Sequence, residues 1–472
     1  MNGDSEQYSI ELRLQSDYDG AFNFLLGGFW MDVDLHNQYW VFANGFDYLA
    51  LVVPAIFGQD GSGWVAPMFN NSTDSYGIES TAVFGEIYYQ LRSDLKLTLG
   101  GRYTIDSKDI KDRPFLLNRD AVTTARLFQP LDADLPITVP QRDTDDEWKE
   151  FTGRAVLDWA LSDETLLYAS FSRGYKGGGF NPPFDPQQFP DQKPDFEPEF
   201  VNAFEIGAKN TLFDNRLQAN FSAFFYDYQD MQISKIVNRT SFNENTDAEI
   251  YGFEAEALFV PDIRWMFNAN LAYLHTEVGE FRSVDTRDPT AGRGDVTLIK
   301  DVSNTSNCVV HHNGAPAPAI DPFSKCYTDV NGTGLKDLLP APYTVDTGVS
   351  VDLEGNQLQN APEWSLSLGG QYTFILPQNY ALSLRVDYYW QDDMYGRIFN
   401  RPIDRIEDWD IWNAQATLSS PDESWYLRAY VKNIGDDDNV VGMYVTDPSS
   451  GLFTNVFTIE PRTYGLAVGY YF

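Results

Sequence analysis

Four side chains of the types that bind metal ions lie in one polar segment of the sequence: Cys308, His311, His312 and Cys326. Thiolates and imidazoles are common zinc ligands, but the spacing here departs from the paired pattern of zinc fingers. Two nearby cysteines in a chain without any other cysteine fit a single disulfide formed in an oxidising compartment. The sequence therefore predicts a disulfide between Cys308 and Cys326, with a zinc site as the alternative.

Two acidic runs and one glycine run are further candidate sites. The aspartates at 436–438 and the Asp-Val-Asn-Gly run at 329–332 could attract calcium, but the second run lacks the glutamate that completes a calcium-binding loop. The three glycines at 177–179 could cradle a phosphate, but no helical pattern and no Lys-Ser/Thr pair follow them. We expect solvated acids in the first two runs and a flexible loop hinge in the third.

No residues for catalysis are visible in this sequence. The chain has no nucleophile elbow, no His-Glu-x-x-His motif and only four histidines. His275 lies in an alternating segment, where we expect a structural role. We therefore expect neither an enzyme nor a bound cofactor or metal.

The composition indicates a folded, acidic protein that does not bind nucleic acid. A formal charge of −36 repels phosphate backbones, and an aromatic content of 15% is unlike that of acidic disordered chains. No run of about 18 apolar residues is present, which excludes an ordinary transmembrane helix. A transmembrane barrel needs no such run because only alternate residues of its strands face lipid.

Apolar and polar residues alternate along most of the chain. In residues 95–106, for example, Leu, Leu, Leu, Gly, Tyr and Ile occupy the odd positions, and most even positions are polar. This period of two predicts β-strands, most of them longer than the strands of soluble sheets. We expect about fifteen strands, at 6–17, 20–33, 77–92, 95–108, 148–161, 164–176, 199–213, 215–235, 247–260, 262–277, 363–376, 379–395, 408–419, 424–435 and 459–472.

The connections between these strands alternate between short and long. Short turns fall near 17–20, 93–94, 162–163, 214, 261–262, 377–379 and 420–423. Long polar segments fall at 34–76, 109–147, 177–198, 236–246, 278–362, 396–407 and 436–458. Short periplasmic turns opposite long extracellular loops are typical of bacterial outer-membrane barrels. The sequence therefore predicts an all-β, antiparallel transmembrane β-barrel in a lipid bilayer.

Aromatic and charged residues have expected places in such a barrel. Trp159, Trp265 and Trp425 adjoin short turns, and a second group adjoins long segments: Trp30, Trp148, Trp364, Trp390, Trp409 and Trp412. Two aromatic belts at the membrane interfaces account for both groups, and the edges of a soluble sheet are the alternative. Charged strand residues should line a wet lumen and pair there, namely Lys96, Arg102, Arg385, Asp387, Arg428 and Lys432. Four loop aromatics could stack on a ligand or pack within the loops: Trp40, Tyr48, Trp64 and Tyr76.

Several segments resemble the TonB-dependent outer-membrane receptors in content, order and spacing. They are YASFSRGYKGGGFN at 168–181, FEPE at 196–199, FEIGAK at 204–209, LFDNRL at 212–217, KNIGD at 432–436, PRTYG at 461–465 and ELRLQS at 11–16. The chain ends in Phe472 after apolar alternate positions, Tyr464, Leu466, Val468 and Tyr470. This ending resembles the signal that the outer-membrane barrel assembly machinery reads.

The resemblance implies a barrel of 22 strands around an N-terminal plug, on which TonB and its inner-membrane energising proteins act. The chain starts without a signal peptide and has about fifteen expected strands. We therefore expect residues 1–472 to be a receptor barrel domain that lacks its plug and first strands. The resemblance implies active uptake of a scarce small-molecule complex, most of all an iron–siderophore chelate, across the bacterial outer membrane.

Two other functions fit the residues. A passive porin-like channel would need an even, closed barrel and would conduct ions. A non-transporting surface protein, such as an adhesin or a soluble β-sandwich, would be extracted without detergent. Among ligands, the acidic loops argue mildly against a strongly anionic one held by loops alone, because like charges repel.

Overall fold

A computed structural model describes residues 2–41, 69–116, 142–182, 184, 192–237, 240–301, 306–327, 333–446, 448 and 451–472. Fifteen strands form its main sheet: β1 (Asn2–Gln15), β2 (Phe22–Val41), β3 (Phe69–Arg92), β4 (Leu95–Leu116), β5 (Arg142–Ser162), β6 (Thr165–Lys176), β9 (Glu199–Leu212), β10 (Leu217–Val237), β11 (Thr240–Phe259), β12 (Trp265–Val278), β18 (Trp364–Ile375), β19 (Ala381–Gln391), β22 (Trp409–Ser419), β23 (Trp425–Lys432) and β26 (Thr463–Tyr470). In this part of the chain, no helix is long and apolar enough to cross a bilayer.

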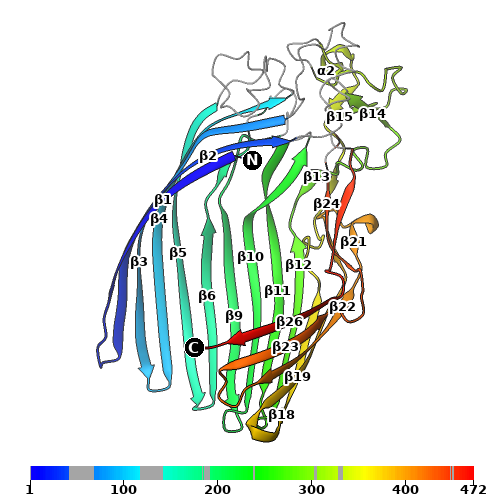
Figure 1. The fold of residues 1–472 in the computed structure, drawn as a ribbon. Helices are drawn as coiled ribbons and strands as arrows, with labels where there is room; N and C mark the ends of the chain where they lie inside the picture. The colour runs from blue at the N-terminus through cyan, green and yellow to red at the C-terminus, as the bar shows by residue number, and fades with distance from the viewer. Residues whose placement is uncertain are drawn as a thin grey trace.

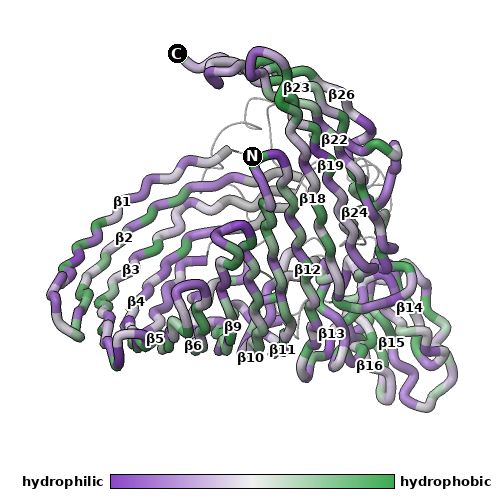
Figure 2. Tube along the Cα trace, turned by 90° about the horizontal axis from the view of Figure 1, so that it is seen from below, coloured by the Kyte–Doolittle hydropathy of each residue, from purple (hydrophilic) through white to green (hydrophobic). Residues whose placement is uncertain are grey.

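The strands follow one another as an antiparallel meander, and β1 and β26 are the two edges of the sheet. Figure 1 shows the short turns at one end of the strands and the small elements of the long connections at the other. Viewed along the strands, the sheet curves into a trough (Figure 2). The fifteen expected strands and the all-β antiparallel fold class are confirmed.

Several strands are longer than the alternation predicted. β3 begins at Phe69 instead of residue 77, and β4 continues to Leu116 instead of residue 108. In these extensions Asp109 pairs with Gly77 on one side and with Asp145 on the other. A ladder of backbone pairs can continue where both faces meet water, so a search for apolar positions underestimates its length.

The register places apolar side chains in rows on one face of the sheet. One row joins Phe171, Phe204, Phe225 and Tyr251 across β6, β9, β10 and β11. Apolar side chains on this face are well exposed, and Ile206 of β9 is 63% exposed. A large exposed apolar face on an antiparallel sheet fits lipid as its surroundings, so we assign this face to the outside of the barrel.

A polar row lies directly beyond that aromatic row, toward the long connections. Arg173, Asn202, Asp227 and Glu249 pair across the same four strands, two residues farther along each. Arg173 donates to Asn202 Oδ1 at 2.9 Å, and Asn202 donates to Asp227 Oδ2 at 3.0 Å. An aromatic row followed directly by a charged row is typical of the place where a membrane surface meets water.

Not all of the tryptophans lie on the outer face, where the two expected aromatic belts would place them. Trp159, beside a short turn, donates to Asp94 Oδ2 at 3.0 Å, and Trp412 packs on the outer face against Tyr388. Trp148 and Trp409 instead lie on the opposite, polar face, and Trp148 is only 9% exposed. The belt prediction is therefore wrong for Trp148 and Trp409, because strand register decides which face a residue occupies.

Charged and hydroxyl side chains cover this polar face, which we assign to the lumen. They pair across strands, as Arg154 does with Glu86 at 2.7 Å. Arg102 lies over the ring of Phe84, with its guanidinium carbon 5.6 Å from the ring centroid. The six residues expected to line the lumen share this face by register: Lys96, Arg102, Arg385, Asp387, Arg428 and Lys432.

The connections hold short elements that the alternation did not predict, because most of them are too short to display a period. They are β7 (Gly179–Phe180), β8 (Asp195–Phe196), β13 (Arg282–Val284), β14 (Val296–Asp301), β15 (Ser306–His311), α2 (Leu335–Leu338), β16 (Thr344–Asp346), β17 (Ser350–Asp352), η2 (Pro377–Asn379), β20 (Met394–Tyr395), η3 (Pro402–Asp404), β21 (Arg405–Ile406), β24 (Val440–Val445) and β25 (Thr454–Thr458). Strands β14, β15 and β16 form a separate sheet.

Candidate ligand-binding mouth

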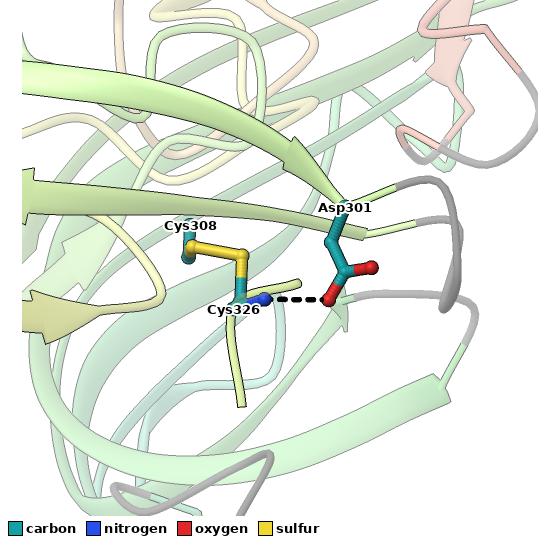
Figure 3. The surroundings of a disulfide bond; sticks show 3 residues. All are labelled: Asp301, Cys308 and Cys326. Atoms are coloured by element: carbon teal, nitrogen blue, oxygen red, sulfur yellow. Dashed lines mark hydrogen bonds between the residues drawn. A yellow bond between two sulfur atoms is a disulfide. The ribbon is translucent and has the colours of Figure 1, made fainter. Parts of the chain in front are cut away.

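The long connection between β12 and β18 has a hydrophobic core of its own. Ile299 of β14 and Val310 of β15 are fully buried there with Cys308 and Cys326. A disulfide joins the two cysteines, whose Cα atoms lie 6.2 Å apart, and the Cys326 amide donates to Asp301 Oδ2 at 2.8 Å (Figure 3). β14, β15, α2 and β16 are termed the disulfide loop below. It is a small folded unit at the end of the main sheet, which is termed the wall below, opposite the short turns (Figure 1).

The histidines beside these cysteines contact other side chains. His312 Nε2 lies 2.8 Å from Thr297 Oγ1, and His311 Nε2 lies 3.1 Å from Asp346 Oδ2. Because the disulfide occupies both sulfur atoms, the alternative zinc site has no thiolate to offer.

Of the two acidic runs, one contacts neighbouring side chains and the other lies outside the described residues. Asp436 lies 3.0 Å from Arg462 Nη2, and the Asn433 side chain donates to the Asp437 carbonyl at 2.7 Å. The run at 329–332 lies outside the described residues. Within those residues, no three His, Cys, Asp or Glu side chains are grouped to hold a metal ion.

Two long connections meet in a group of charged side chains termed the arginine–aspartate cluster: Asp285, Arg287, Arg397, Arg401 and Asp404. The Asp404 side chain is fully buried and lies 2.7 Å from Arg287 and 3.4 Å from Arg397. The Asp285 side chain, 4% exposed, lies 2.7 Å from Arg397 and 2.8 Å from Arg401. The cluster ties the connection after β12 to the connection after β19.

The charge pairing in this cluster outweighs the cost of burial at Asp285. Burial alone would raise the pKa of Asp285, but the hydrogen bond and charge of Arg397, with a further hydrogen bond from Arg401, hold that pKa below its usual range. Arg287 also donates to Thr454 Oγ1 in the connection after β23. A third long connection is thereby joined to the first two.

The glycine run at 177–179 lies where the connection after β6 packs against its neighbours. Gly178 and Gly179 are buried, and a Cβ on Gly178 would lie 2.5 Å from the Phe196 carbonyl oxygen. Lys108 Nζ donates to the Gly178 carbonyl at 2.5 Å and lies 5.4 Å from the centroid of the Trp148 ring. The expected flexible hinge is therefore wrong, because glycine is required here by the close approach of backbone and rings.

Asn181 ends this segment and links it to two others. Its buried side-chain amide donates to the carbonyls of Lys193 and Asn243, each at 3.0 Å, and accepts from the Asn243 amide at 2.7 Å. Arg142, which lies 2.8 Å from Asp112, donates to the Asn181 carbonyl. Every polar atom of the buried side chain is bonded, which fixes these connections to the ends of β4, β5 and β11.

A cavity of about 400 Å³, termed the mouth pocket, lies between the ends of β10 and β11 and the connection after β12. Its charged lining residues are Lys235, Glu244, Arg282 and Asp346. Lys235 Nζ lies 2.7 Å from Glu244 Oε1 and 3.2 Å from Ser283 Oγ. Glu244 occupies an even position of β11, as the lumenal residues of that strand do, so the pocket opens toward the lumen.

The loop aromatics proposed to stack on a ligand are only partly described. Tyr76 is half-buried in β3 opposite Ile110 and does not line the mouth pocket. Trp40 belongs to β2, whereas Tyr48 and Trp64 lie outside the described residues. A ligand contact by these four residues stays a prediction.

The C-terminal residues lie on the outer face of the edge strand β26. Tyr464, Leu466, Val468 and Tyr470 pair with residues of β23 and are between 65% and 77% exposed. Phe472, the last residue, is also exposed. Recognition of this ending by the barrel assembly machinery stays a prediction.

Sequence analysis missed the residues of the mouth pocket. Lys235 is the last position of one expected strand, and Glu244 lies in a segment expected to be a loop. β10 and β11 in fact remain paired there, and a bulge between Tyr228 and Met231 changes the face that later residues of β10 occupy. No periodic signal could show that Lys235 and Glu244 face each other.

Solved structures of two receptors and a copper transporter share the fold at low sequence identity. The ferric yersiniabactin uptake receptor FyuA from Yersinia pestis has a TM-score of 0.65 and 13% identity, over 99% of this chain and 54% of that chain. The siderophore receptor PiuA from Acinetobacter baumannii has a TM-score of 0.62 and 16% identity, over 99% of this chain and 56% of that chain. The copper transporter OprC has a TM-score of 0.57 and 14% identity, over 100% of this chain and 56% of that chain.

The chain therefore spans about half the length of these proteins. The family described as "TonB dependent receptor-like, beta-barrel" matches residues 2–310 and 319–434, which is most of the sequence. The match covers every strand of the meander except the last, β26, and most of the connections that form the mouth. This chain belongs to the family of TonB-dependent receptor β-barrels.

Proposed function

We propose that this chain forms the wall and extracellular mouth of an outer-membrane receptor for TonB-dependent uptake of a scarce nutrient complex. Membership in the receptor family is the observation that carries the proposal. An iron–siderophore chelate is the first candidate, since FyuA and PiuA are named as ferric yersiniabactin and siderophore receptors. Copper is the metal to test beside iron, because the copper transporter OprC shares the fold.

The arrangement of the described residues supports this function. The exposed apolar face suits a lipid bilayer, and the paired charges of the opposite face suit a wet lumen. At one end of that lumen, the connections are held by a disulfide and by buried hydrogen bonds. A mouth ordered in this way can present fixed polar groups to a ligand, which lowers the entropy lost on binding.

The proposal includes three partners besides the ligand and the bilayer. TonB and its inner-membrane energising proteins would act through a plug, as in the family at large. The barrel assembly machinery would read the ending at Tyr464, Leu466, Val468, Tyr470 and Phe472. The bacterial outer membrane is the proposed location.

Uptake by living cells tests the proposal. Iron-starved cells that produce the protein would be given radiolabelled iron chelates, with and without a protonophore, beside a strain in which the gene is deleted. We expect uptake to require both the gene and the energised inner membrane. Uptake that needs the gene but ignores the protonophore would indicate a passive channel and would refute active transport.

A further inference from the structure

We infer that the mouth pocket takes a neutral or singly charged chelate that offers N–H or O–H donors, and that it rejects polyanionic chelates. The inference rests on the proposed function and narrows its ligand class. It starts from the charges of the pocket, whose described lining has two cationic side chains, Lys235 and Arg282, and two anionic ones, Glu244 and Asp346. A pocket built for a polyanion would instead gather unpaired arginines and lysines.

Both cationic groups already have anionic or carbonyl partners. Lys235 Nζ lies 2.7 Å from Glu244 Oε1. Arg282 lies 3.4 Å from Asp352 Oδ2 and donates to the Ser350 carbonyl at 3.0 Å. A polyanion would have to compete with these carboxylates for the cations, in a protein of net charge −36.

Hydrogen-bonding capacity remains at the Lys235–Glu244 pair. Glu244 Oε2 is buried and has no hydrogen-bond partner among the described residues, so it can accept a donor from a ligand. The ammonium of Lys235 has three N–H donors, and the described contacts to Glu244 and Ser283 use two of them. One acceptor and one donor thus lie side by side, which suits the hydroxyl and amide groups of an uncharged chelate.

The size of the pocket is compatible with such a ligand. A cavity of about 400 Å³ lies within the range of small-molecule sites. Hydroxyl and amide side chains, among them Ser283, Thr286 and Asn307, complete its polar lining. These groups can bond neutral polar atoms without any change in net charge.

Two iron complexes of opposite character test the inference on the full chain purified in detergent. The probes are a neutral ferric trihydroxamate and a trianionic ferric tris-catecholate, and binding is followed by quenching of tryptophan fluorescence. We expect the neutral complex to bind at least about tenfold more tightly at low ionic strength. Added salt should narrow this ratio because it screens the repulsion of the trianion.

Replacement of one pocket carboxylate by a neutral amide should change the affinities of the two complexes in opposite directions. Loss of a merely structural contact would not do so. In Glu244→Gln, Lys235 loses its anionic partner and keeps only a neutral acceptor, so the trianion should bind about tenfold more tightly while the neutral complex binds a few-fold more weakly. Glu249→Gln is the matched control, since Glu249 lies on the same strand, on the outer face, and is exposed. The control should leave both affinities unchanged.

The outcomes separate the two levels of the proposal. Tighter binding of the trianion by the unmodified chain, or equal effects of the two glutamate variants, would overturn the charge preference alone. No binding of either complex would overturn the proposed uptake of iron chelates, and with it the inference.

Discussion

The wall and the mouth of this protein are organised for different surroundings. On the wall, large apolar side chains are exposed, as Leu466 and Val468 are at 77% and 76%. In the disulfide loop, the apolar residues Ile299, Val309 and Val310 are fully buried. Along its exposed apolar band, the wall thus has its charged groups on the inside, whereas the loop is built around a dry core like a small water-soluble domain.

The difference shows that one chain can suit both lipid and water, because the wall and the mouth are stabilised by different interactions. Between its edge strands β1 and β26, the wall satisfies its backbone groups through one continuous ladder, which a bilayer requires because lipid offers no hydrogen bonds. The connections lack such a ladder, and they are held by a disulfide, buried amides and buried ion pairs. Substitutions should therefore affect the two regions separately, and four experiments test that separation.

The largest effect is expected from Asp404→Asn in the arginine–aspartate cluster. The buried Asp404 carboxylate pairs with both Arg287 and Arg397, and loss of one member of a buried pair costs about 3–5 kcal/mol. Hydrogen exchange should accelerate at 282–288 and 394–406, with little change in the wall. Asp393→Asn is the control, since its exposed pair with Arg405 contributes less than about 1 kcal/mol. Equal exchange in the two variants would contradict the assigned role of the cluster.

The next effect concerns the wall. Ile206→Arg places a charge in the exposed apolar face, which costs about 2–4 kcal/mol in a bilayer but within about 0.5 kcal/mol on a surface in water. Ile263→Arg is the control, because Ile263 lies in a short turn and is 87% exposed. Urea unfolding in lipid vesicles measures both. If the two variants were equally stable, the apolar face would not contact lipid.

Removal of the disulfide tests the mouth alone. The bond closes a segment with a sequence separation of 18, for which the loss of chain entropy predicts about 3 kcal/mol of stabilisation. The double variant Cys308→Ser, Cys326→Ser should be cut faster by proteases within 306–327, while the unfolding midpoint of the wall stays the same. Reduction of the unmodified protein should reproduce this result. A change in the wall midpoint would show that the two regions are coupled.

The same contrast explains what could be predicted from the sequence. The wall repeats one pattern, so alternation located fifteen strands and the lumenal positions of residues such as Arg385 and Lys432. The connections that form the mouth show no such repeated pattern of residues. Contacts such as Arg287 with Asp404 and Lys235 with Glu244 depend on how connections fold against one another and on a bulge. Only the cysteine pair could be proposed in advance, because its chemistry allows a single intramolecular partner.

The smallest effect is a response of the mouth to acid. Asp285 has a pKa below its usual range: burial opposes the shift, but Arg397 and Arg401 more than compensate for it. A depressed carboxylate pKa stabilises the folded state above the unfolded pKa, which is about 3.9, and this stabilisation is lost as the pH falls through the folded pKa. Hydrogen exchange at 394–406, corrected for its intrinsic pH dependence, should therefore rise steeply only in that acidic window. Asp285→Asn should be less protected at neutral pH, because Arg397 and Arg401 lose a charged partner, and should lose most of the acid response. If the variant kept the full acid response, another carboxylate would control the opening of these connections. Such a result would move the pH sensitivity out of the cluster but would leave the separation of mouth from wall intact.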